Sequence, residues 1–406
     1  MVQRDPADIE EQRRLENSLE DAAIALEVAV LAIIARRLGK LENVPLVEVY
    51  ASMPADIAEM QKAIREGSKG LQQTVRNAID AMASANDGWA ADFYAAKGIE
   101  QIPASEHFAM KEAIRRNAKA VTDTIKAMCD SSVIAIIRED ARGKKVQYTP
   151  LEEGYKQIVS EAASSMANGS KTVEQAVSQA VRNLSQNGLK VRYAPRYDAQ
   201  GSKVYTTRNL HSAVRMNVMD AYRTCMGELR EIQGREFGAD GVEVSAHALS
   251  APDHVEYQGI QYSYEPKRGY KLWDDVKRET AARPLETGAN CGHMLSYILL
   301  DVSEPKYTKA ELRDLKNRSQ ESVTFKGLSG DELTMSRYEA SQYQRRLETT
   351  IRDAKKDAYL NEQAKQASKA KEARAKARAY TSQYKRISKE VGLIARDDLL
   401  RLHVQK

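Results

Sequence analysis

Cysteine is scarce in this sequence, and what there is lies scattered. Cys129, Cys225 and Cys291 are the only three cysteines in 406 residues. Small secreted proteins are held by closely spaced, even-numbered cysteines, so an odd and widely spread set argues against a disulfide framework. The pattern indicates a protein that folds in a reducing cytoplasm.

Long apolar runs are scarce too. The stretch AAIALEVAVLAIIA at residues 22–35 has fourteen residues and contains Glu27, whereas a helix needs about 20 apolar residues to cross a bilayer. The first residues, MVQRDPADIEEQRR, mix charges of both signs and lack the basic-then-apolar order of a signal peptide. We therefore expect a buried helix at 22–35 and no membrane partner.

Aromatic residues make up only 6% of the chain, whereas charged residues make up 29%. This composition is typical of a helix-rich, well-solvated protein. The 62 basic and 57 acidic residues nearly cancel, so the net charge of +5 does not by itself identify a partner. The length allows two or three domains, and no internal repeat of about 20–50 residues indicates a solenoid.

Apolar spacing and helix-breaking residues predict a mostly α protein with a central α+β module. We expect an N-terminal helical bundle at 1–148, the module at 149–306 and a C-terminal helical, basic region at 307–406. The first segment should hold helices at 7–41, at 55–84 with Pro54 in its first turn, and at 105–142. Strands are expected where Val191 and Tyr193 pair with Val204. Further expected helices lie at 150–167, 172–186, 208–237 and 272–280.

The later part of the chain shows β alternation followed by helix. Alternating apolar residues predict strands at 242–246 and 260–264. A helix should begin near Lys309, and a Gly/Ser-containing connector, FKGLSGDEL, should lead to one long helix from 334 to 379 or beyond. The closing residues, ISKEVGLIARDDLLRLHV, are expected to pack back on the core.

Residues that commonly bind metals gather in the central module. His247, His254, Cys291 and His293 together offer the four imidazole or thiolate groups that a closed tetrahedral zinc site requires. Their spacing matches no standard zinc finger. Zinc is therefore one interpretation of this group, and the other is a set of packed or hydrogen-bonded residues at a turn.

A third interpretation makes Cys291 a nucleophile. A thiol needs a neighbouring imidazole to ionise near neutral pH, and His254 or His293 could be that base. Asp253 and Asn290 are the nearby residues that could orient it. This interpretation would make the protein a hydrolytic enzyme.

Two basic stretches are candidate contact surfaces. The predicted strand–turn–strand near residue 200 alternates basic and aromatic residues, a pattern that suits either a nucleic acid or a neighbouring protein, and we favour the protein. Its members are Lys190, Arg192, Tyr193, Arg196, Tyr197, Lys203 and Tyr205.

The second basic stretch has nine Lys or Arg residues against one acid between Lys365 and Lys389. A helix with one sign of charge on most faces tends to bind a polyanion, so non-specific DNA contact is one interpretation and a solvated helix is the other. The candidate DNA-binding residues are Lys365, Lys369, Lys371, Arg374, Lys376, Arg378, Lys385 and Arg386.

Three ordered blocks resemble a known family. They are SAPDHVEYQGIQYS, GANCGHMLSYILLDVSEPKYTKAELRDL and LTMSRYEASQYQRRLETTIRDAKK. Over roughly residues 150–404 the chain resembles the type 2 minor capsid proteins of tailed phages. The matching positions are His254, Tyr257, Gln258 and Gly259, then Asn290, Cys291 and His293, then Tyr338, Glu339, Gln342, Gln344 and Arg345.

The sequence departs from the family pattern at two positions: Ala251 and Gly292 stand where members carry Arg. The resemblance implies a structural, non-enzymatic role in a virion head, with the portal protein or the major capsid protein as partner and packaged DNA as a further contact. Two other classes remain as alternatives, a DNA-binding module acting through the basic C-terminal helix and a hydrolase at the His254, Cys291 and His293 site.

Overall fold

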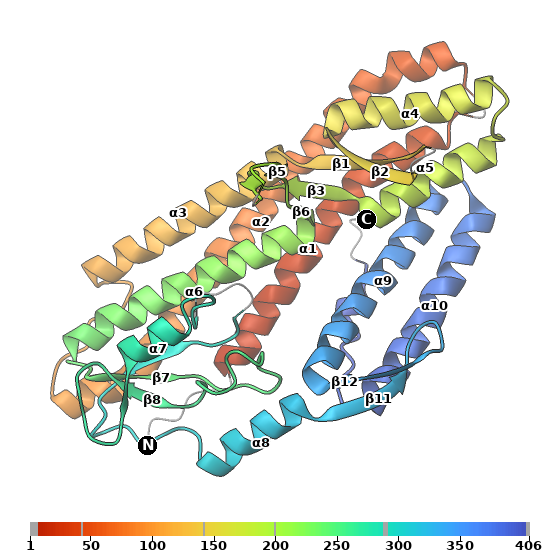
Figure 1. Ribbon diagram of the computed structural model, residues 1–406. Helices are drawn as coiled ribbons and strands as arrows, with labels where there is room; N and C mark the ends of the chain where they lie inside the picture. The colour runs from red at the N-terminus through yellow and green to blue at the C-terminus, as the bar shows by residue number, and fades with distance from the viewer. Residues whose placement is uncertain (1–6, 42–43, 141–142, 199, 287–290, 403–406) are drawn as a thin grey trace.

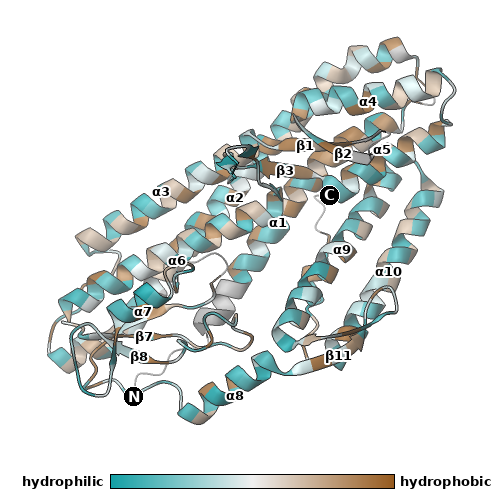
Figure 2. Ribbon diagram, viewed as in Figure 1, coloured by the Kyte–Doolittle hydropathy of each residue, from teal (hydrophilic) through white to brown (hydrophobic). Residues whose placement is uncertain are grey.

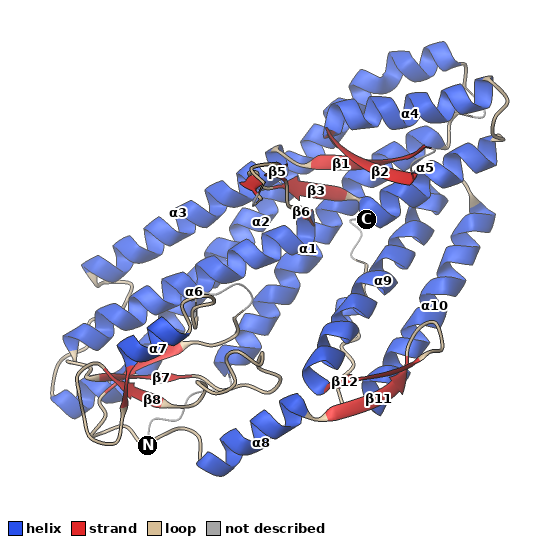
Figure 3. Ribbon diagram, viewed as in Figure 1, coloured by secondary structure: helices blue, strands red, loops and turns tan. Residues whose placement is uncertain are grey.

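The computed structural model describes residues 7–41, 44–140, 143–198, 200–286 and 291–402. The chain is 62% helical and 12% strand, with the strands in small sheets among long helices (Figure 3). The expected fold class, mostly α with an α+β module, is confirmed.

Four long helices, α1 (Ala7–Leu38), α2 (Leu46–Lys97), α3 (Phe108–Asp130) and α6 (Leu210–Glu236), pack lengthwise against one another (Figure 1). The apolar stretch of α1 is buried as expected, with Val28, Leu31 and Ile34 at 0% exposure. Within the described residues, none of the helices has the length and apolarity that a membrane span requires.

The second helix is longer than expected at both ends. It begins at Leu46 after Pro45, and Pro54 lies inside it rather than in its first turn. The buried side chains Met53 and Ile57 keep the helical apolar spacing on either side of the proline, so packing maintains the helix. The carbonyl that loses a hydrogen bond to Pro54 belongs to Tyr50, which is exposed and can be solvated.

The third helix is shorter than expected, because it ends at Asp130. Residues expected to continue it form strand β1 (Val133–Asp140), which pairs antiparallel with β2 (Gly143–Pro150). The run Val-Ile-Ala-Ile-Ile is rich in β-branched side chains, which fit a pleated sheet better than a helix. Helices α4 (Leu151–Ala167) and α5 (Val173–Asn187) then follow as predicted, and Thr172 caps α5.

This first sheet has the order β2-β1-β3-β6, with β3 at Leu189–Arg192 and β6 at Thr207–Asn209. Val191 pairs with Arg208, so the expected pairing with Val204 is wrong. A separate small hairpin, β4 (Arg196–Tyr197) with β5 (Lys203–Val204), lies between the two strands in sequence. Residues 189–209 therefore form two pairs of strands, β3 with β6 and β4 with β5, where one pair was expected.

A second sheet has the order β10-β7-β8-β9 and confirms the strands expected around residues 242–246 and 260–264. Its strands are β7 (Gly241–Val244), β8 (Gln261–Ser263), β9 (Lys271–Leu272) and β10 (Leu295–Ile298), and helix α7 (Trp273–Glu279) lies beside them. Every residue of β7 is buried, so both faces of the strand are covered.

The C-terminal region differs from the expectation in two places. After α8 (Lys309–Gln320), the supposed connector forms a hairpin of β11 (Ser322–Lys326) and β12 (Glu332–Ser336). The expected single helix is two, α9 (Arg337–Gln363) and α10 (Ala367–Glu390), separated at Lys365, whose φ is +60°. The two helices fold back on each other (Figure 1), and Leu399 and Leu400 in the short helix η1 (Asp398–Leu400) are buried.

The largest apolar cluster takes residues from Leu15 to Ala364 and so draws on all three predicted segments. Apolar residues concentrate on β1, β7 and β11, whereas α8 is mostly polar (Figure 2). The boundaries at 148/149 and 306/307 therefore stay a prediction about folding units, while the described core runs across them.

A buried carboxylate lies where these parts meet. Glu27 of α1 is 2% exposed and lies 3.0 Å from the Lys356 ammonium of α9 and 3.4 Å from His211 Nδ1 at the start of α6. It also accepts the backbone N–H of Leu189 at 3.3 Å. Burial alone would raise the pKa of Glu27, but the Lys356 charge and the His211 hydrogen bond outweigh burial and lower it to about 2.

We expect Lys356→Met to destabilise the protein by about 3–5 kcal/mol, because the change leaves the Glu27 charge buried without its cation. Because the pKa of Glu27 is lowered from 4.5 to about 2, the stability that its ionised form contributes should be fully present above pH 4.5 and be lost as the pH falls toward 2. Urea unfolding at several pH values measures both effects. Lys62→Met on exposed α2 is the control and should change stability by less than about 0.5 kcal/mol; equal losses in the two variants would contradict the prediction.

Candidate functional site

Strand pairing explains why His254 and Cys291, with thirty-six residues between them in the sequence, meet. β7 and β10 are antiparallel, with Leu295 opposite Val244, so the end of one strand lies beside the start of the other. The loop after β7 carries His254, and Cys291 and His293 come just before β10. Two further bonds, Ser245 N–H to Met294 O at 2.9 Å and Met294 N–H to Ser245 Oγ at 2.8 Å, extend the contact to the loops.

The structure brings together three of the four predicted ligands. Cys291 Sγ lies 3.4 Å from His254 Nδ1 and 3.4 Å from His293 Nδ1. One ligand atom from each residue lies within 4.8 Å of the other two. Each of the three residues is only 1% exposed. These donors have the composition of a metal-binding group, which we call the His-Cys-His cluster.

Hydrogen bonds from the outer ring nitrogens fix the orientation of both imidazoles. His254 Nε2 lies 2.7 Å from the carbonyl oxygen of Arg283, which can only accept, so this nitrogen carries the proton. His293 Nε2 lies 3.3 Å from Gln258 Oε1. That amide oxygen is identified by a second donor, the backbone N–H of His247 at 3.2 Å. Both Nδ1 lone pairs therefore face the Cys291 sulfur.

The thiol of Cys291 is poorly placed for attack on a substrate. Burial raises its pKa, although the backbone N–H groups of His293 and Glu286 and the more distant Arg223 and Arg283 favour the thiolate. A nucleophile needs both thiolate character and access. Cys291 is only 1% exposed, so the geometry favours a structural role over the hydrolase interpretation.

His247, the predicted fourth ligand, lies beside the cluster rather than within it. Its ring centroid is 4.5 Å from that of His293, and its Nδ1 contacts the carbonyl oxygen of Ala248 at 3.1 Å. A Cβ on Gly292 would lie 3.0 Å from His247 Nε2. The imidazole thus lies close to the space that a side chain at 292 would need.

The predicted motif residues around the cluster shape the loop. Asp253 forms an ion pair with Arg283 at 2.9 Å and so holds the segment whose carbonyl binds His254. Gln258 joins His247 to His293 as described above. Gly259 has φ +70°, and a Cβ there would lie 2.3 Å from Leu312 of α8, so glycine is required. Asn290 lies outside the described residues.

The basic C-terminal residues lie along α10 and the turn before it. Six of the eight predicted DNA contacts are exposed, and Lys369 and Arg386 are partly covered. Ion pairs engage Lys369 with Glu372 at 3.2 Å and Arg386 with Glu390 at 2.9 Å. Arg374 and Lys385 are also in ion pairs, so the positive character of this surface depends mostly on Lys365, Lys371, Lys376 and Arg378.

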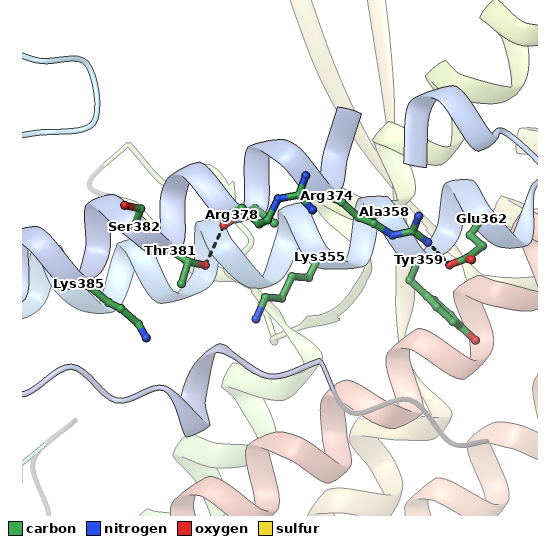
Figure 4. A pocket seen from close by; sticks show the side chains of 10 residues that line it. Lys355, Ala358, Tyr359, Glu362, Arg374, Arg378, Thr381, Ser382 and Lys385 are labelled. Carbon is green, nitrogen blue, oxygen red and sulfur yellow. Dashed lines mark hydrogen bonds and ion pairs between the residues drawn. The ribbon is translucent and has the colours of Figure 1, made fainter. Parts of the chain in front are cut away.

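A groove of about 670 Å³ runs along α9 and α10 (Figure 4). Lys355 and Lys385 reach to the same side of the two helices in this view. Arg374 is paired with Glu362 at 2.6 Å and Lys385 with Asp397 at 2.7 Å. The groove is lined by Lys355, Ala358, Tyr359, Glu362, Arg374, Ala377, Arg378, Thr381, Ser382 and Lys385.

The other predicted basic surface, near residue 200, is shared between the small β4–β5 hairpin and the residues on either side of it. Tyr197 is 66% exposed and Val204 48% exposed on the two strands of the hairpin. Arg192 lies over the Tyr205 ring, with 3.6 Å from its guanidinium carbon to the ring centroid. Lys190 bonds to Asn209, and Tyr193 accepts a hydrogen bond from Asn217 at 3.3 Å, so these two half-buried side chains are held against the fold. Arg196 and Lys203 are exposed on the hairpin.

Comparison with protein families shows which family the chain belongs to. The family model of phage minor capsid protein 2 matches residues 19–387. The chain belongs to the phage minor capsid protein 2 family. The match begins well before residue 150, so family likeness includes the N-terminal helices that the sequence motifs left out. Neither the curated proteins nor the solved structures that were compared with the chain gave a match.

Two family motif residues in α9 serve the fold. Glu339 completes a capping box with Ser336 at the start of the helix. Gln344 is buried and donates to Ser388 Oγ at 2.8 Å and to the carbonyl oxygen of Ile394 at 3.0 Å, tying α9 to α10 and the closing turn. The Ser-x-x-Glu spacing announces the cap in the sequence, whereas the partners of Gln344 depend on the tertiary fold. In this chain these two residues therefore stabilise the fold.

Restoring the family's Arg by Gly292→Arg should destabilise this chain by about 1–3 kcal/mol, because its Cβ presses on His247 Nε2. In a His247→Ala background the same change should cost less, and the difference is the coupling between the two positions. A double-mutant cycle from urea unfolding measures it. Additive losses would show that His247 does not occupy the space of the family's Arg.

Proposed function

We propose that this minor capsid protein is a structural, non-enzymatic component of the phage head that attaches to the portal protein or the major capsid protein. The family match over residues 19–387 carries the proposal. A capsid family implies contacts with other virion proteins, and the chain offers exposed apolar residues for them. The β4–β5 hairpin is the proposed contact arm, because Tyr197 and Val204 are exposed on its strands.

We further propose that the α9–α10 face lies toward packaged DNA. The groove brings Lys355, Arg378 and Lys385 to one surface, and the neighbouring α10 cations Lys371 and Lys376 are exposed. Phosphate contacts of this kind give affinity without reading base sequence. Binding should therefore be non-specific and strongly dependent on salt.

The triple change Lys371→Gln, Lys376→Gln and Arg378→Gln should weaken duplex DNA binding and flatten its dependence on salt. For every phosphate that the variant no longer neutralises, the slope of log affinity against log salt should fall by about 0.9. Fluorescence anisotropy with a random-sequence duplex at several salt concentrations measures both. These residues are exposed, so the melting temperature should hardly move.

The matched control removes the same charge elsewhere. Arg65, Lys69 and Arg76 are exposed on α2, and their change to Gln also subtracts three positive charges. We expect this control to keep the wild-type slope. If both triple variants lose the same amount, net charge rather than the α10 surface governs binding. Wild-type protein that shows no salt-sensitive binding would contradict the DNA proposal outright.

Tyr197→Ser together with Val204→Ser should reduce association with the portal or major capsid protein, because the changes remove apolar surface from the proposed contact arm. Co-expression with each candidate followed by size-exclusion chromatography at micromolar concentration gives the measurement. Phe108→Ser is the control, since Phe108 is also an exposed apolar side chain, at 81%. Separation of the wild-type chain from both candidates would overturn the proposed attachment.

A further inference from the structure

We propose that the His-Cys-His cluster binds a zinc ion through His254 Nδ1, Cys291 Sγ and His293 Nδ1, with the fourth tetrahedral position left to a ligand outside these three residues. Three features support this site independently of the portal and DNA contacts: the positions of the three donor atoms, the hydrogen bonds to the outer ring nitrogens and the placement of the cluster between two loops.

The spacing of the donors fits a tetrahedral ion. Zinc binds sulfur at about 2.3 Å and imidazole nitrogen at about 2.0 Å, so a tetrahedral angle separates the two ligand atoms by about 3.5 Å. Both sulfur–nitrogen distances in the cluster are 3.4 Å. One ligand atom from each of the three residues lies within 4.8 Å of the other two, so the three donors are close enough to share one ion.

Without a cation, the cluster has too few protons for its lone pairs. His254 Nε2 and His293 Nε2 carry protons that they donate outward to Arg283 and Gln258. Both Nδ1 atoms are then acceptors, and both face one sulfur. A thiol has one proton, which can satisfy only one of the two. A cation between the three atoms satisfies both imidazoles and the sulfur together.

The outward hydrogen bonds are themselves typical of metal-binding histidines. Such a histidine nearly always donates its other ring N–H to a carbonyl, carboxylate or water, which fixes the ring and its tautomer. Here the carbonyl of Arg283 and the amide oxygen of Gln258 fill that role. Gln258 is 2% exposed, so its amide oxygen is a buried acceptor for the outer N–H of His293.

Zinc suits this donor set and this location. One thiolate and two imidazoles are ligands that zinc binds in proteins, whereas calcium and magnesium prefer oxygen. The three residues are buried, so the ion would lie in the interior of the protein. Zinc there would fasten the loop after β7 to the start of β10, where Leu295 pairs with Val244. Binding exchanges the thiol proton for the metal, so one proton is released to the buffer per zinc bound.

Purified wild-type protein should contain one equivalent of zinc by elemental analysis and lose thermal stability when a strong chelator removes it. Cobalt(II) added to the metal-free protein should give a thiolate-to-cobalt charge-transfer band and intense tetrahedral ligand-field bands. Wild-type protein that binds neither zinc nor cobalt overturns the proposal, and this result does not depend on any variant folding.

Three variants test the ligand assignment. Cys291→Ser should abolish the charge-transfer band, whereas Cys225→Ser, at another buried cysteine, should keep it. Gln258→Leu should weaken zinc binding by about 10–100-fold by removing the outer hydrogen bond of His293. His247→Ala should retain one equivalent of zinc, because the three-residue group excludes it. A full band in Cys291→Ser, or loss of metal in Cys225→Ser to the same extent, would show the assignment to be wrong.

Discussion

The buried ion pair of Glu27 and Lys356 is the contact on which the arrangement of the chain depends. Glu27 belongs to the first helix and Lys356 to the ninth, and they meet at 3.0 Å in the interior. Desolvation makes an isolated buried charge very unfavourable, so each group requires the other. His211 and the Leu189 N–H complete the shell of the carboxylate, which therefore joins α1, α6, α9 and β3.

This contact also limits its surroundings. A Cβ on Gly188 would come within 1.7 Å of Glu27 Oε1, and φ at this residue is +50°, so only glycine fits. Nearby, Arg352 pairs with Glu20 at 2.7 Å and donates to the carbonyl oxygen of Leu399 at 3.0 Å. The ion pair thus fixes α9 to α1, and the hydrogen bond fixes the closing residues to α9. The groove of the α9–α10 pair takes its position from these contacts, since α9 forms one of its sides.

Short sequence patterns predicted the elements in which apolar side chains recur with a single helical or strand period. The capped helix after Thr172 and the strand at Val242–Val244 were predicted correctly because capping and alternation act within a few residues. The predictions were wrong where tertiary packing or turn geometry determines the secondary structure. Pro54 lies inside a helix because apolar residues on both sides are buried, and Lys365 breaks a helix that has no proline there. Neither outcome is visible in the local composition.

The candidate site shows the same division between local and distant causes. Its residue types were evident from the sequence, and the expected group of four becomes three with His247 alongside. Which ring nitrogen faces the sulfur could not be predicted, because the tautomers depend on Arg283 and Gln258 from other parts of the loops. Convergence itself needs the β7–β10 register, since a shift of one residue would reverse the side to which every side chain of β10 points. The register of one short strand pair therefore decides whether these three donors form a site at all.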